Sequence, residues 1–191
     1  YLNQNIQNLN LAIFVPPQIF TRNYMKVPMM VRVFDHTHSL AQLSNMRSNY
    51  NLIFPMSNYS LSYNLIKRIG YWDTCADAIG EDFHTVQKAF WKTRGEAFNV
   101  PIYVPFNQLN VETGKGGRSD VLARFWQAER HAQGVADVGY NINMLQKTQF
   151  FSTKSLLIVY CIGECFILPA LLPWIALSTM KNTDILFFMK D

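Results

Sequence analysis

Short apolar runs and helical repeats alternate along the first 120 residues. Four apolar stretches are bounded by prolines or polar residues, which is the pattern of short strands. Prolines beside or inside a run confine a strand to a short length or to a sheet edge. The apolar stretches are Leu9–Val15, Pro28–Phe34, Asn51–Phe54 and Asn99–Val104, and all but the second are predicted as strands.

Helical repeats fill most of the space between these runs. A helix can lie between His36 and Met46. A second is predicted from Ser60, a suitable N-cap, to Ile69. A third is predicted over Phe83–Arg94, where apolar residues recur on one face. Alternating strands and helices predict an α/β domain over residues 1–120.

The pattern changes after residue 120. Apolar residues recur at threes and fours over residues 121–149, which predicts an amphipathic helix. Such a helix suits a membrane surface, although a helix packed on a soluble core would show the same pattern. Ser155–Leu177 is then apolar over about 23 residues, enough to cross ~30 Å of hydrocarbon. We expect a transmembrane region over residues 150–191, with a buried soluble helix as the alternative.

Composition agrees with a membrane protein. Charged residues make up 16% of the chain and hydrophobic residues 49%, whereas about 25% charge is usual in soluble domains. The net charge of +4 fits an anionic ligand or lipid head groups, and the absence of a dense Lys/Arg stripe argues against nucleic acid. The chain starts at Tyr1 and ends in an apolar run, so we expect a fragment of a longer protein.

Two segments carry candidate chemistry. Glu81 and Asp82 stand at a predicted helix start, where the positive end of the dipole favours an ionised carboxylate. Such a carboxylate can act as a general base, but simple capping explains it as well. Gln127 and Arg130 are three apart and share a helix face, with His131 one position on. Arginine suits bidentate phosphate binding, and a plain interfacial polar face is the alternative.

Other polar and aromatic residues are less specific. His36 and His38 lack a third metal ligand fixed by the sequence, so we expect them to be exposed polar residues. Trp72, Trp91 and Trp126 are most simply core or interface anchors. A sugar-stacking role for one of the tryptophans has no support in their spacing.

Taken together, these segments resemble the membrane-bound family 2 glycosyltransferases, the group of the cellulose, chitin and hyaluronan synthases. Gly80-Glu81-Asp82-Phe83-His84-Thr85 is similar to the family's Thr-Glu-Asp motif, and Gln127-Ala128-Glu129-Arg130-His131 to its Gln-x-x-Arg-Trp motif. The run from Phe54 to Ser60 stands where the family lines its acceptor channel. The resemblance covers roughly Phe54 to Leu177.

The resemblance implies the C-terminal half of a GT-A (Rossmann-like) catalytic domain over residues 1–120, then an interfacial helix and a membrane span. It implies an inverting transfer of sugar from a nucleotide-sugar donor to a glycan or lipid-linked hydroxyl, on the cytosolic face of a membrane. Asp82 would be the base, with Glu81 in support. Gln127 and Arg130 would bind the donor diphosphate. The acceptor side would hold four residues: His131, Asn58, Tyr59 and Ser60.

Two features depart from the family pattern. The family's tryptophan is His131 here, and its threonine is Gly80. The family's divalent metal (Mg²⁺ or Mn²⁺) is bound by an Asp-x-Asp motif, which this chain lacks. We therefore expect most metal ligands upstream, with His84 as a candidate within the chain. A catalytically inactive membrane scaffold or subunit that retains the fold is the competing hypothesis.

Overall fold

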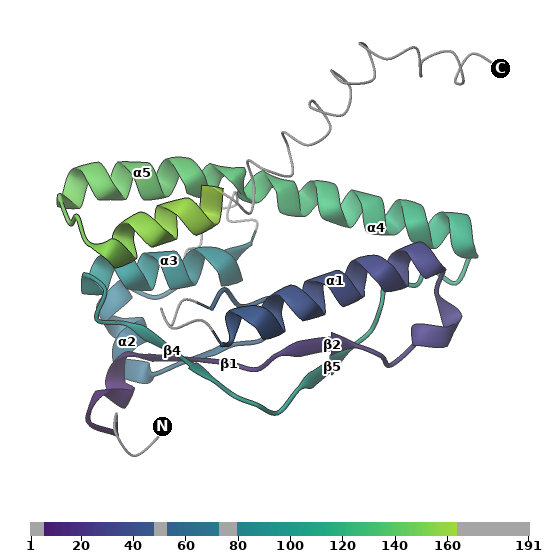
Figure 1. The fold of residues 1–191 in the computed structure, drawn as a ribbon, viewed down its shortest axis with the longest axis horizontal. Coiled ribbons are helices and arrows are strands. Elements are labelled where there is room, and N and C mark those ends of the chain that lie inside the picture. Colours follow the sequence, from purple (N-terminus) through teal and green to yellow (C-terminus); the bar gives the residue numbers. More distant parts are fainter. Residues whose placement is uncertain (1–5, 48–52, 73–79, 164–191) are drawn as a thin grey trace, which may run out of the picture. The chain divides into compact units, whose positions relative to one another are not determined.

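The computed structural model describes residues 6–47, 53–72 and 80–163, drawn as ribbon in Figure 1. The chain divides into two compact units, Tyr1–Gln133 and Gly134–Asp191. The elements of the first unit, in chain order, are η2 (Ile6–Leu11), β1 (Ala12–Val15), β2 (Gln18–Phe20), η3 (Tyr24–Lys26), α1 (Met29–Asn45), β3 (Ser60–Leu61), α2 (Tyr63–Ile69), α3 (Glu81–Thr93), β4 (Phe98–Pro101), β5 (Phe106–Gln108) and α4 (Gly117–Ala132).

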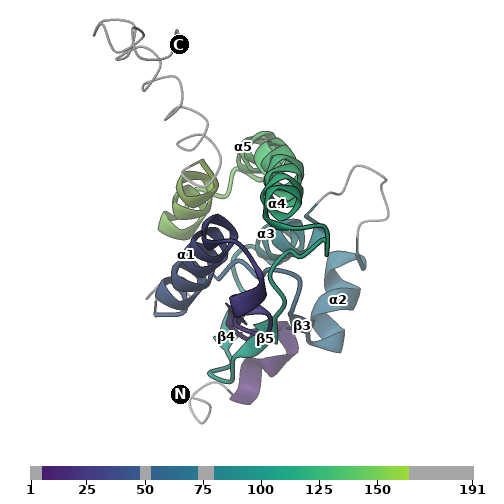
Figure 2. The same ribbon diagram turned by 90° about the vertical axis from the view of Figure 1, so that its right-hand side faces the viewer.

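Two small sheets organise the first unit. One has the order β3-β1-β4, in which β1 runs antiparallel to β3 and parallel to β4. The other pairs β2 with β5 in parallel. In Figures 1 and 2, α1, α3 and α4 lie on the same side of the strands. The mixed sheet and its helical cover confirm the predicted α/β class.

Strand β1 passes through the apolar core. Ala12 and Val15 are fully buried, and Ile13 packs in one cluster with Leu65 of α2 and Val86 of α3. Burying an aliphatic side chain of this size stabilises the fold by about 1.5–3 kcal/mol. The core therefore fixes α2 and α3 against the central sheet.

Helices α2 and α3 have the ends that the sequence predicts, within a few residues. The N-cap of α2 is Ser62, whose side chain accepts from the Leu65 N–H at 3.4 Å, because Ser60 is taken by β3. Gly70 closes α2 in the left-handed conformation, at φ 79°. Helix α3 begins two residues earlier than predicted, at the acidic pair Glu81 and Asp82, and Arg94 is its left-handed C-cap.

Three predictions about secondary structure were wrong in part. Residues 9–11 belong to the 3₁₀ helix η2, so the first strand is shorter than predicted. Helix α1 begins at Met29, inside an apolar stretch that resembles a strand. Ile53 and Phe54 form no strand; Ile53 is buried in the core, and the Phe54 ring stacks on that of Phe83 with centroids 4.5 Å apart.

The second unit contains helix α5 (Ala136–Thr148) and a further helical stretch over residues 153–163. The 3₁₀ turn η4 (Gln133–Val135) precedes α5, so the predicted single helix over 121–149 is interrupted. Within residues 6–47, 53–72 and 80–163, no helix has the length and apolarity needed to cross a membrane. Most of the predicted span Ser155–Leu177 lies outside the described residues. The assignment of functions to residues 1–120, 121–149 and 150–191 stays a prediction.

Candidate active site

The Asp82 carboxylate is held at the start of α3 by two backbone N–H groups. Ser57 N–H donates to one oxygen at 2.5 Å, and Phe83 N–H donates to the other at 2.8 Å. The side chain is half-buried. A carboxylate offers about four acceptor positions, and the described residues occupy two of them through Ser57 and Phe83. The local structure thus caps the helix and still leaves a carboxylate that can accept a proton.

Tyr59 connects the neighbouring carboxylate to two other segments. Its hydroxyl donates to Glu81 Oε2 at 2.7 Å and accepts from the Trp72 indole N–H at 3.0 Å. It also lies 3.4 Å from Thr85 Oγ1. Burial raises the pKa of Tyr59 to about 12, so the hydroxyl keeps its proton at neutral pH and can continue to donate to Glu81.

The predicted acceptor-side residues before α2 differ in their surroundings. The Tyr59 hydroxyl is hydrogen-bonded to Glu81 and Trp72. Asn58 is half-buried, and its amide nitrogen is buried without a hydrogen-bond partner among the described residues. Ser60 is exposed and pairs with Phe14 in the sheet. The structure thus brings Tyr59 to the acidic pair and places Ser60 at an exposed position of β3.

Gln127 on α4 is held by an arginine that the sequence interpretation missed. Arg124 Nη1 donates to Gln127 Oε1 at 2.8 Å, and its Nε forms an ion pair with Asp35 Oδ1 of α1 at 2.8 Å. Because the amide oxygen is occupied, the amide nitrogen of Gln127 is directed elsewhere and can donate to an anion. Arg124 and Asp35 are 89 positions apart, so no local pattern could have revealed their pairing.

Burial and the charge of Arg124 shift the pKa of Asp35 in opposite directions. The side chains of Arg124 and Asp35 are only 8% and 2% exposed. Burial raises the pKa of Asp35, and the Arg124 charge counteracts part of that rise. Arg124 also lies over the Phe34 ring, 4.2 Å from its centroid. Helix α4, which carries Gln127 and Arg130, is therefore fixed to α1 by an ion pair that is largely removed from water.

The two halves of the predicted donor site are not joined by a described contact. Arg130 is on α4, in its last turn, and His131 follows it as an exposed residue. No hydrogen bond or ion pair among the described residues joins Asp82 to Gln127. The roles of the acidic pair, of the predicted diphosphate clamp (Gln127 and Arg130) and of the acceptor-side residues remain predictions.

His38 of α1 lies near Arg124 and His131 of α4. Burial, together with the nearby Arg124 and His131, lowers the pKa of His38 to about 4. The ring packs against Phe34, with centroids 4.9 Å apart. His38 is thus half-buried and neutral at physiological pH, rather than the exposed polar residue that the sequence predicts.

We expect this histidine to make stability pH-dependent. In the unfolded chain its pKa is near 6.5, so between pH 6.5 and 4 the unfolded state binds more protons than the folded state. The His38 contribution is present above pH 6.5 and is lost as the pH falls towards 4. The His38→Gln variant should therefore lose less thermal stability than wild type over this interval.

The measurement is the thermal midpoint at steps between pH 7.5 and 4.5, as the difference between wild type and variant. His36→Gln on the same helix is the matched control, because His36 stacks on the Tyr24 ring with centroids 5.0 Å apart. Parallel curves for wild type and His38→Gln would contradict the prediction.

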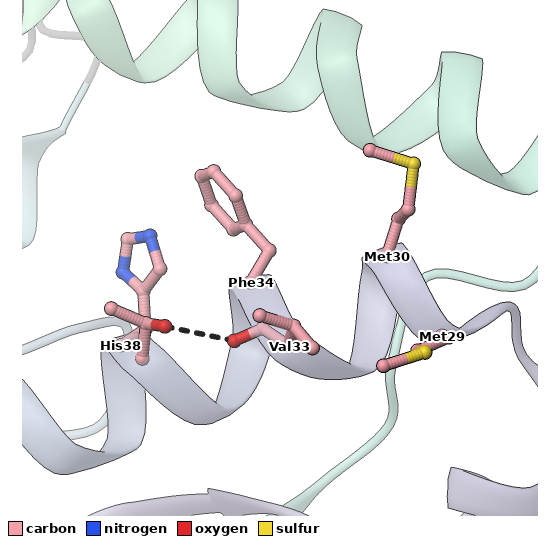
Figure 3. Close-up of a pocket in the computed structure, with 6 residues that line it drawn as sticks. Met29, Met30, Val33, Phe34 and His38 are labelled. Atoms are coloured by element: carbon pink, nitrogen blue, oxygen red, sulfur yellow. Dashed lines mark hydrogen bonds between the residues drawn. The ribbon is translucent and has the colours of Figure 1, made fainter.

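An apolar groove lies on α1, at a distance in sequence from the acidic pair. It has a volume of about 430 Å³ and is lined by Met29, Met30, Val33, Phe34, Thr37 and His38. Figure 3 shows that Met30, Phe34 and His38 project from the same side of α1. A nucleotide diphosphate is bound mainly by cationic side chains, whereas this lining contains no Lys or Arg and its polar side chains are those of Thr37 and His38. The groove therefore does not mark the donor site.

The described residues do not suit the expected divalent metal. Nowhere in residues 6–47, 53–72 and 80–163 do three or more His, Cys, Asp or Glu side chains gather as ligands. His84 is half-buried on α3, and it belongs to no such group.

Comparison with known proteins gives the family. The model of "Glycosyl transferase family group 2" matches residues 3–189, nearly the whole chain. No curated protein and no solved structure matches. The mixed α/β architecture is consistent with a GT-A-like fold. The chain therefore belongs to glycosyl transferase family group 2.

Proposed function

We propose that the protein transfers a sugar from a nucleotide-sugar donor to a hydroxyl of a glycan or lipid-linked acceptor, with inversion at the anomeric carbon. The observation that carries the proposal is the Asp82 carboxylate, fixed by Ser57 N–H and Phe83 N–H with acceptor positions to spare. A positioned carboxylate of this kind contributes typically 10²–10⁴-fold as a general base.

The proposed step is a single displacement. The acceptor oxygen attacks the anomeric carbon while Asp82 takes the hydroxyl proton. The bond from that carbon to the diphosphate oxygen breaks, and the nucleoside diphosphate leaves with the electron pair. Gln127 and Arg130 would offset the charge that develops on the leaving group. Attack opposite to the leaving group inverts the configuration.

The test is an assay of membranes that contain the full-length protein, given a panel of nucleotide sugars. We expect one donor to release nucleoside diphosphate together with a glycosylated product of inverted anomeric configuration. A product of retained configuration would contradict the single displacement. We propose an integral membrane location with the catalytic part on the cytosolic face; sedimentation of the activity with membranes, and its release by detergent, would test the membrane location.

The clamp gives a separate prediction. We expect Arg130→Ala to weaken product inhibition by the nucleoside diphosphate by about 10–100-fold, because a charge-assisted bond to phosphate contributes about 1.5–3 kcal/mol. Arg118→Ala is the matched control, since Arg118 is exposed near the start of the same helix. Unchanged inhibition in Arg130→Ala, or an equal loss in Arg118→Ala, would remove Arg130 from the clamp.

A further inference from the structure

We propose that the exposed face of the Trp72 indole is a stacking site for a sugar ring of the acceptor. The proposal rests on the proposed transferase function and deepens it, because it names the group that would hold the acceptor beside the base. Three features of the structure support it.

The first feature is that Trp72 is exposed and yet anchored. Its side chain is 51% exposed, whereas Trp91 of α3 is 2% exposed and belongs to the core. The only polar atom of the Trp72 side chain donates to the Tyr59 hydroxyl at 3.0 Å. The polar edge of the ring is therefore satisfied within the protein, and apolar ring surface remains exposed to the solvent.

The second feature is the strained turn that presents the ring. Gly70 and Tyr71 are both left-handed, at φ 79° and 65°. Glycine adopts this conformation freely, but a tyrosine does so at a cost. The Lys88 ammonium donates to the Tyr71 carbonyl at 2.9 Å and so fixes the turn to α3. Strain of this kind persists where the surroundings over-determine it, often at binding sites.

The third feature is the position relative to the acidic pair. The Tyr59 hydroxyl that accepts from Trp72 also donates to Glu81 at 2.7 Å. Ser57, two residues before Tyr59, donates its N–H to Asp82. Trp72 is thus one hydrogen-bonded side chain away from the acidic pair. Ser57 and Glu81 are exposed, so this neighbourhood is open to a ligand.

This combination suits a carbohydrate. A pyranose ring presents C–H groups on its faces and hydroxyls around its edge. An aromatic plane can contact the face, while carboxylates such as Glu81 accept from the edge hydroxyls. A phosphate would be repelled by the two carboxylates, so the site favours the neutral acceptor over the charged donor.

The kinetic test compares Trp72→Ala and Trp72→Phe in the full-length protein. We expect Trp72→Ala to raise the acceptor KM at least 10-fold, and Trp72→Phe to raise it less than about 3-fold because an aromatic plane remains. The donor KM and the hydrolysis of donor by water should stay unchanged in both. Trp126→Ala, which alters another exposed tryptophan (55%), should leave the acceptor KM unchanged. An unchanged acceptor KM in Trp72→Ala would overturn the proposal.

A binding test separates this proposal from the transferase function. Cellotetraose and chitotetraose serve as probes, with intrinsic tryptophan fluorescence as the readout. We expect at least one of them to change the emission of wild type and of Trp126→Phe, but not that of Trp72→Ala. A change that persists in Trp72→Ala, or no change with either saccharide, would overturn the stacking site. Saccharide binding without any sugar transfer would instead contradict the function and leave the site standing.

Discussion

Asp82→Asn is expected to lower sugar transfer by about 10²–10⁴-fold, the usual contribution of a positioned general base. Asparagine has the same shape but cannot take the acceptor proton at neutral pH. Its single amide oxygen can still accept one of the two backbone N–H groups that now bond to the carboxylate. We therefore expect a stability loss of only about 1 kcal/mol, which leaves the variant folded. The measurement is initial transfer rate at saturating donor, with thermal midpoints to verify folding.

Glu81→Gln is the matched control for this substitution. Glu81 is the neighbouring carboxylate of the same helix turn, and its described hydrogen bond is to the Tyr59 hydroxyl. An amide oxygen can still accept that bond, so transfer should fall far less than in Asp82→Asn. Near-normal turnover in Asp82→Asn would sink the assignment of the base. A wild-type protein that transfers no sugar from any donor would favour the inactive scaffold.

Arg124→Leu is expected to destabilise the protein by about 3–5 kcal/mol, because it leaves the buried Asp35 carboxylate without a counter-charge. At roughly 2–4 °C per kcal/mol for a chain of this size, the thermal midpoint should fall by roughly 10 °C. The double variant Asp35→Leu/Arg124→Leu removes both charges and should recover most of the loss. Arg118→Leu, at an exposed position, should change the midpoint little.

The difference between the single and double variants should also depend on pH. Loss of Arg124 removes the charge that lowers the pKa of Asp35, so burial alone then raises it. A raised folded-state pKa means that the folded state binds the proton more tightly than the unfolded state, so the penalty shrinks as the pH falls. A single variant as stable as wild type, or a double variant no better than the single, would show that the ion pair does not hold α1 to α4.

The sequence predicts α2 and α3 well because their ends carry local signals. Gly70 and the acidic pair Glu81 and Asp82 mark boundaries that depend only on neighbouring residues. Helix α1 is harder to predict, because its start lies in an apolar, β-branched stretch. Its helical state is accompanied by packing against β2 and α4, and tertiary contacts of this kind override local propensity.

The candidate site is predictable in its residue types but not in its connections. Local motifs identify Asp82 and Gln127. The ion pair of Asp35 with Arg124 and the anchoring of Trp72 by Tyr59 join separate segments. From the hydropathy pattern alone, Arg124 is predicted as a surface residue of a helix and Trp72 as a core or interface anchor. Only the folded arrangement shows that one orients Gln127 and that the other is fixed beside the acidic pair.

The parallel pairing of β1 with β4 has a consequence for synthesis. Ala12 pairs with Phe98. During synthesis, β1 therefore has no β4 partner until the ribosome has added 86 further residues (98 − 12). At about 5–20 residues per second, that interval is roughly 4–17 s. Strand β3 is made earlier and can shield one edge of β1 meanwhile. Tyr59, Trp72 and Asp82 all lie between the paired strands in sequence, so the acidic part of the candidate site would be enclosed only when the nascent chain closes this loop.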